Sequence, residues 1–193
     1  MLITSITKQK ADRYEIYVDG EKYGVLDGVV LASHRLKVGS ELNEEELSSI
    51  RSESGVSFAF SDGIKYLSRS RHTESEVRGR LAEKGYDESV IDGALKKLRE
   101  YGYVDDEAYA KAYVSVHSAT RGKNRLRYEL ALKGVSREYI DGALPDDEYR
   151  TAYLLAQKKK SKYDSADKLI RYLLSRGFEY EVARRAVGDL EKL

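Results

Sequence analysis

The chain has 193 residues, of which 41% are hydrophobic and 35% are charged, and its formal net charge is +1. It contains no Cys, which excludes disulfides and thiolate chemistry and fits a reducing compartment. The first ten residues lack the apolar core of a secretory signal, and no apolar stretch approaches the length of a membrane span. We therefore expect a cytoplasmic protein without a membrane partner.

Residues 1–60 differ from the rest of the chain, and we expect them to form a small α+β cap. Residues 14–18 alternate between apolar and polar side chains, and Asp19-Gly20 separates them from a second short run that ends at Leu26. An Asp-Gly pair between two such runs is a strong signal for a β-hairpin. Asn43 and Glu46 have the spacing of a capping box at the start of a short helix. The Ser-rich residues 51–61 are expected to form a loop or linker.

From residue 61 onward the hydrophobic period is helical, and one unit recurs three times. The pentapeptide IDGAL at residues 91–95 returns letter for letter at residues 140–144, and each copy follows a Lys-Gly pair at the same offset. A third, weaker copy follows Arg176-Gly177. We therefore predict a mainly α protein with three tandem three-helix repeats, at residues 61–104, 105–145 and 146–193. Such repeats are expected to stack into an elongated, curved array.

Capping residues and glycines set the expected helix boundaries within each repeat. In the first repeat a short helix is expected over residues 64–69, Thr73 and Glu76 form a second capping box, and Asp87 can cap the third helix. In the second repeat, Ser136 caps a third helix that Pro145 ends. The apolar face predicted for the first helix of that repeat comprises Tyr109, Ala112, Tyr113 and Val116.

Carboxylate pairs open the second repeat at residues 105–106 and the third at residues 146–147, and Asp62 has a similar place in the first. Such pairs can hold Mg²⁺ or perform acid–base chemistry. Helix capping explains all three positions, and we prefer it. His34, His72 and His117 are scattered and have no ligand-like neighbours. No catalytic residue, metal site or cofactor is predicted.

The most informative charge pattern is the absence of Asp and Glu from three segments at the same phase of the repeat, residues 63–73, 108–128 and 149–163. In a regular stack these segments would make a positive stripe along one side. Cations also collect at helix C-termini, but that preference explains only one or two residues per helix. The candidate contact residues are Arg69, Arg71, Arg121, Lys123, Arg125, Arg127, Lys158, Lys159, Lys160 and Lys162.

On these motifs the chain resembles the RecX family of bacterial regulatory proteins over nearly its whole length. The resemblance is carried by residues 66–67, 76–78, 81–86, 98–107, 109–110, Gly122, Leu126, 129–130 and 133–135. It is most specific from Gly102 to Gly134. Residues 3–26 look like the extended N-terminus of longer members. The family often has Phe or Trp in the helix after the Asp pair, where this chain has Tyr109 and Tyr113. The third repeat matches the family pattern least well.

The resemblance implies a non-enzymatic regulator of homologous recombination, DNA repair and the SOS response that binds the RecA recombinase. Members of the family lie along RecA–DNA filaments and inhibit strand exchange, ATP hydrolysis and co-protease function. The implied partners are RecA protein and the RecA–DNA filament, and direct contact with single- or double-stranded DNA stays open. We expect a monomer.

Two other function classes compete with this interpretation. The three-helix units resemble helix-turn-helix readers, which suggests a stand-alone DNA-binding protein. The net charge of +1 argues against that alternative, because such domains are usually strongly basic. The third class is an enzyme, for which the sequence offers no site.

Overall fold

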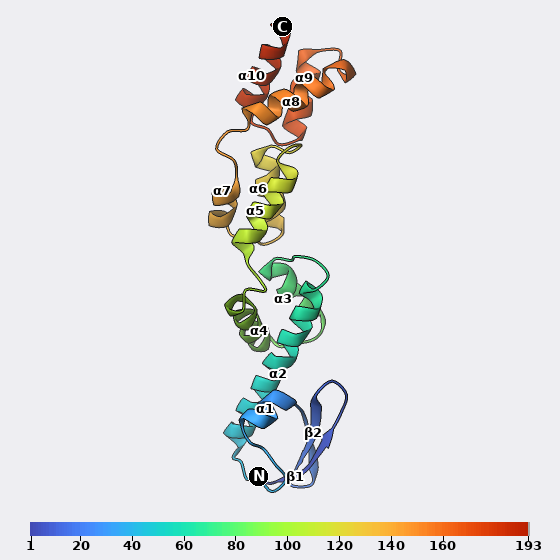
Figure 1. The fold of residues 1–193 in the computed structure, drawn as a ribbon, viewed down its shortest axis with the longest axis vertical. Helices are drawn as coiled ribbons and strands as arrows, with labels where there is room; N and C mark the ends of the chain where they lie inside the picture. The colour runs from blue at the N-terminus through green and yellow to red at the C-terminus, as the bar shows by residue number, and fades with distance from the viewer. Residues whose placement is uncertain (193) are drawn as a thin grey trace. The chain divides into compact units, whose positions relative to one another are not determined.

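The computed structural model describes residues 1–192 and is mostly helical (Figure 1). Leu193, the last residue of the predicted third repeat, lies outside the described residues. The chain divides into two compact units. The first unit contains residues 1–72 and 77–104, and the second contains Thr73–Glu76 together with the chain from Asp105 onward.

The first unit begins with a three-stranded antiparallel sheet in the order β1-β2-β3 (Figure 1). The strands are β1 (Ile3–Lys8), β2 (Arg13–Val18) and β3 (Glu21–Asp27). The predicted hairpin is confirmed: Asp19 and Gly20 join β2 to β3 with φ values of 50° and 86°. Two successive positive φ angles match the right-handed twist of the flanking strands, and Asp-Gly adopts them readily. The short helix α1 (Gly28–Ser33) follows directly.

Helix α2 (Glu44–Leu67) is 24 residues long and passes through the region predicted as a linker. Its predicted capping box is present, since Asn43 and Glu46 each accept a hydrogen bond from the other's backbone N–H. The expectations of a loop over residues 51–61 and of a separate helix over residues 64–69 are wrong. Small residues are used here for close packing: a Cβ at Gly63 would lie 2.8 Å from the Leu98 side chain. Tertiary packing thus overrides the weak helix propensity of the Ser-rich run.

The first repeat is completed by α3 (Glu74–Glu83) and α4 (Glu88–Glu100), which begin and end close to the predicted residues. Gly85 and Gly102 follow these helices with φ values of 84° and 71°, a left-handed conformation typical of helix C-termini. Asp62 lies inside α2 and accepts hydrogen bonds from Tyr86 and Lys84, so its predicted capping role is wrong. The core of this repeat comprises Ala59, Val77, Leu81, Val90, Ile91, Ala94, Leu95, Leu98 and Val104.

In the second unit, the second repeat consists of α5 (Asp106–His117), α6 (Lys123–Leu132) and α7 (Arg137–Ala143). The predicted apolar face of α5 is confirmed for Tyr109 and Tyr113, which pack against the core, and is wrong for Val116. Ala110 and Val114 are the buried residues, whereas Val116 is 72% exposed. The two tyrosines of the helix pack at the edge of the core. Helix α5 therefore places Ala110 and Val114 in the core and the two tyrosines beside them.

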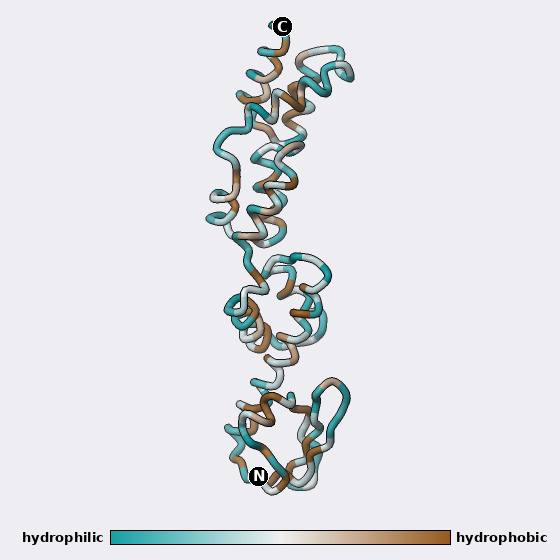
Figure 2. The backbone as a smooth tube through the Cα atoms, in the orientation of Figure 1, coloured by the Kyte–Doolittle hydropathy of each residue, from teal (hydrophilic) through white to brown (hydrophobic). Residues whose placement is uncertain are grey.

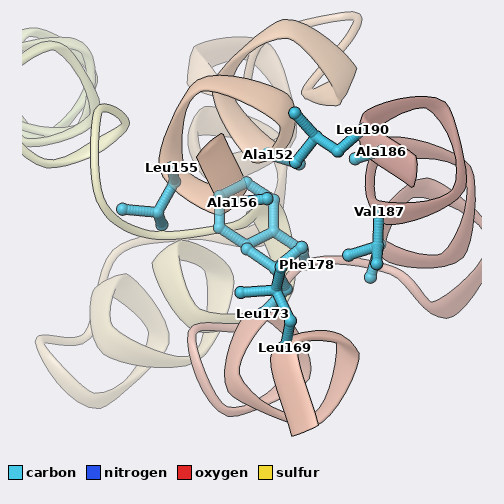
Figure 3. Close-up of a cluster of buried hydrophobic side chains, with 10 residues drawn as sticks. Ala152, Leu155, Ala156, Leu169, Leu173, Phe178, Ala186, Val187 and Leu190 are labelled. Atoms are coloured by element: carbon cyan, nitrogen blue, oxygen red, sulfur yellow. The ribbon is translucent and has the colours of Figure 1, made fainter. Parts of the chain in front are cut away.

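The third repeat contains α8 (Tyr149–Lys159), a 3₁₀ turn η1 (Lys160–Lys162), α9 (Ala166–Ser175) and α10 (Tyr180–Glu191). Figure 2 shows brown and teal residues alternating along these helices, the pattern of amphipathic packing. Phe178 is the largest buried side chain of this core and lies among Leu173 and Ala156 (Figure 3). The remaining labelled core residues are Ala152, Leu155, Leu169, Ala186, Val187 and Leu190.

Candidate partner-binding surface

The cations of the second repeat have partners within the second unit, although residues 108–128 contain no Asp or Glu. The Arg121 guanidinium donates to the Tyr113 hydroxyl at 2.8 Å and to Glu129 Oε2 at 2.6 Å. Arg125 Nε donates to the other oxygen of Glu129 at 2.9 Å. The Glu129 side chain is only 17% exposed, so this cluster is partly shielded from water. Two of the predicted contact residues therefore stabilise the repeat itself.

The Glu129 cluster also changes two pKa values. Burial alone would raise the pKa of Glu129, but hydrogen bonds from Arg125 and Tyr113 and the charge of Arg121 outweigh it and hold the pKa below its usual value. Burial and the hydrogen bond to Glu129 raise the pKa of Tyr113. Both shifts keep the carboxylate charged and the phenol neutral, which is the state that the hydrogen bonds need.

The other two predicted residues of this segment are also engaged. Arg127 Nε lies 3.3 Å from Asp141 Oδ1 on α7, and Arg137 contacts the other oxygen of the same carboxylate at 3.4 Å. Lys123 Nζ donates to the backbone carbonyl of Asp146 at 2.7 Å. The three arginines of this segment thus pair with carboxylates that lie outside it, and Lys123 pairs with a backbone carbonyl.

The basic segment of the third repeat is arranged differently. Within residues 1–192, the side chains of Lys158, Lys159 and Lys162 form no hydrogen bond or ion pair. Lys158 and Lys162 are exposed, and Lys159 is half-buried. Lys160 Nζ donates to the carbonyl of Leu190 at 2.9 Å. Three unpaired cations therefore lie within five residues at the end of α8.

In the first unit, Arg69 and Arg71 lie on the loop that follows α2. Both are exposed, and neither side chain has an ion pair within the described residues. The loop is ordered by the ring of His72, which stacks on Tyr66 with centroids 4.0 Å apart and contacts the Ser70 hydroxyl at 2.8 Å. These two arginines belong to the first unit, and the other eight candidate residues belong to the second.

Sequence reasoning missed a buried carboxylate that joins the second and third repeats. Glu148 is 4% exposed, and its two oxygens accept hydrogen bonds from the backbone N–H groups of Lys123 at 2.6 Å and Glu179 at 2.9 Å. It therefore accepts the N–H of the first residue of α6 and that of the residue that precedes α10. Gly122 N–H donates to the carbonyl of Arg176 at 2.9 Å, and a Cβ at Gly122 would lie 2.2 Å from the Phe178 nitrogen.

A second carboxylate of the second unit also accepts a backbone N–H from another helix, at the first turn of α3. Asp106 Oδ1 accepts the N–H of Glu74 at 2.9 Å, and the Thr73 hydroxyl donates to the carbonyl of Lys133 at 2.7 Å. The carboxylates predicted as helix caps thus act partly on other helices. Asp105 is a true cap, because its side chain accepts the N–H of Ala108.

Among residues 1–192, no group of three or more His, Cys, Asp or Glu side chains could hold a metal ion. Among the same residues, no helix is long and apolar enough to cross a membrane.

These features define a tandem three-helix protein with a small N-terminal sheet and basic segments on exposed surfaces. Residues 59–98, 105–144 and 146–187 match the first, second and third three-helix domains of RecX. The chain is 32% identical to the regulatory protein RecX of Clostridium perfringens strain SM101, covering 97% of this chain and 95% of that protein. It is 31% identical to the RecX of Caldanaerobacter subterraneus, covering 97% and 99%.

Solved structures agree with the sequence matches. A crystal structure of a regulatory protein RecX has a TM-score of 0.74 and 31% identity, covering 94% of this chain and 96% of that one. RecX from Lactobacillus salivarius shares the fold with a TM-score of 0.66 and 24% identity, covering 72% of this chain and 98% of that one. The chain belongs to the RecX family of regulatory proteins.

Proposed function

We propose that this protein binds RecA and RecA–DNA filaments and inhibits the recombinase, ATPase and co-protease activities of RecA without catalysing a reaction. The observation that carries the proposal is the match of all three repeats, in order, to the RecX domains. The known behaviour of the family then supplies RecA as the partner. The near-neutral charge of +1 favours a protein partner over bare nucleic acid.

The physical basis that we infer is rigid bridging of a polymer. Glu148 and Gly122 hold the second and third repeats together through backbone hydrogen bonds, so the second unit can act as one body. A rigid body that contacts neighbouring RecA protomers resists the changes in spacing that filament growth and ATP turnover need. The unpaired cations at Lys158, Lys159 and Lys162 supply charge for acidic RecA surface or DNA phosphate.

The proposal is tested by adding the protein to RecA filaments on single-stranded DNA and following ATP hydrolysis. We expect hydrolysis to fall at ratios well below one protein per RecA. Unchanged hydrolysis, combined with tight and salt-sensitive binding to bare duplex DNA, would instead identify a stand-alone DNA-binding protein.

The contribution of the cations is tested by changing Lys158, Lys159 and Lys162 together to Glu. A matched control reverses three cations of the same unit that are already paired on exposed surfaces. The control residues are Lys111, Lys168 and Lys192. Both variants change the net charge equally, so a weaker inhibition by the first variant alone assigns the effect to position rather than to total charge.

A further inference from the structure

The three repeats provide an internal comparison of their second helices, α3, α6 and α9. The helices align on paired buried residues and on the glycine that follows, which in α6 are Leu126, Leu130 and Gly134. Relative to these positions, α6 places Tyr128 and Leu132 on its outer side. The corresponding residues are Gly79 and Glu83 in α3, and Arg171 and Ser175 in α9. The repeat fold therefore does not need an apolar side chain at either position.

Both apolar side chains of α6 extend into solvent. Tyr128 is 65% exposed and Leu132 is 70% exposed, and a spacing of four residues places them on the same face of the helix. Within residues 1–192, the Tyr128 hydroxyl has no hydrogen bond and its ring has no ring partner. By contrast, Tyr113 on α5 has both, through Glu129 and His117. The contacts within the described residues thus give no structural reason for the apolar side chains of Tyr128 and Leu132.

The charges around this face are mostly positive. Helix α6 carries Lys123, Arg125 and Arg127 against the single acid Glu129. The side chains of Arg125 and Arg127 are 48% and 43% exposed, whereas that of Glu129 is 17% exposed. The outer face of α6 therefore presents an apolar centre with arginines beside it. A complementary partner has an apolar centre and acidic edges.

We propose that the outer face of α6, centred on Tyr128 and Leu132, is a docking surface for an apolar protein segment flanked by acidic residues. The inference rests on the proposed function, in which that segment belongs to RecA. Protein is favoured over nucleic acid because aliphatic Leu132 offers no ring for base stacking.

The third repeat supplies a substitution that the fold accepts. A double variant, Tyr128→Arg with Leu132→Ser, places in α6 the residues that α9 has at the same positions. A second variant, Tyr128→Ala with Leu132→Ala, removes the apolar groups without adding charge. The matched control is Val116→Ser on α5, which removes an equally exposed apolar side chain from another helix. Circular dichroism and the melting temperature check that all three variants fold.

The experiment measures the affinity of labelled protein for RecA filaments on single-stranded DNA, together with binding to bare single-stranded DNA. We expect both double variants to bind filaments about ten-fold more weakly or worse, with Val116→Ser unchanged. Equal filament binding by the wild type and both double variants would overturn the docking surface and leave the proposed function intact. A loss confined to bare DNA would overturn it too, since the face would then bind nucleic acid. Absence of filament binding by the wild type would overturn both proposals.

Discussion

In the second unit, residues 121–127 and residues 158–162 are both rich in cations and free of acids, yet the fold uses them differently. Arg121, Arg125 and Arg127 are held by carboxylates of α6 and α7. Lys158 and Lys162 have no such partner within the described residues. The first segment mainly builds its repeat, whereas the second is available to another molecule. Local charge in a sequence therefore does not measure free charge on a surface.

Among substitutions in the two segments, the largest loss of stability is expected at Gly122, in the first segment. Gly122→Ala places a Cβ 2.2 Å from the Phe178 nitrogen and 2.3 Å from the Gly177 carbonyl carbon, and backbone atoms cannot move aside cheaply. We expect the free energy of unfolding to fall by about 3 kcal/mol in urea denaturation. Gly188→Ala in α10 is the control, because no atom lies within 4 Å of the added carbon. It should stabilise the protein by about 0.5–1 kcal/mol.

The next largest effect is expected at Glu148, which connects the first segment to the third repeat. Glu148→Ala leaves the N–H groups of Lys123 and Glu179 without their acceptor in a partly buried place. We expect a loss of about 2–3 kcal/mol in the same measurement. Asp147→Ala is a matched control that removes only the exposed cap of Tyr149, and it should cost about 1 kcal/mol or less. Equal losses in the two variants would contradict the joining role of Glu148.

A direct comparison of the segments is Arg121→Met against Lys159→Met. Removing Arg121 leaves the poorly exposed Glu129 with Arg125 as its remaining cation, so we expect a loss of about 1–2 kcal/mol. Lys159 has no partner to lose within residues 1–192, and its variant should melt at the wild-type temperature. If the two variants have the same melting temperature, the cations of the first segment do not stabilise the fold more than those of the second.

Much of this fold could be predicted because its local signals are strong. The hairpin at Asp19-Gly20 and the capping box at Asn43 depend on neighbouring residues alone, and both are present. The continuous helix α2 could not be predicted in the same way. Its Ser and Gly residues weaken the helical signal, and Gly55 and Gly63 are favourable because side chains of α4 pack closely against them. Long-range packing supplies the information that the local pattern lacks.

The sequence predicts a basic surface, but it does not reveal which of the cations are paired within the fold. Glu129 directly follows the acid-free segment, and its spacing of four from Arg125 is a sequence signal for an ion pair. The repeats also contain a sign of the pairing between Arg127 and Asp141. The first repeat has Arg78 and Asp92 at the same separation along the chain, and these two residues are in contact as well. By contrast, the role of Glu148 depends on two helices that are adjacent only in the folded unit.

The smallest expected effects concern pH and compare two carboxylates of the second unit with opposite shifts. The pKa of Glu129 is held below its ordinary value of 4.5. Folding therefore favours the ionised form, and this stabilisation is complete above pH 4.5 and is lost as the pH falls through the folded-state pKa. Burial raises the pKa of Asp106 above 3.8, only partly opposed by the N–H of Glu74. Its ionisation is a cost that is absent below pH 3.8 and complete above the raised pKa.

These opposite signs predict different acid limbs in the free energy of unfolding, measured in urea from neutral pH to pH 3. Glu129→Gln should lower stability at neutral pH and make its fall on acidification shallower. Asp106→Asn keeps an acceptor for the Glu74 N–H but removes the ionisation cost, so its fall on acidification should be steeper than in the wild type. Both differences should stay below about 1 kcal/mol because the groups are partly solvated. Parallel curves for all three proteins would mean that the ionisation of neither carboxylate is coupled to folding.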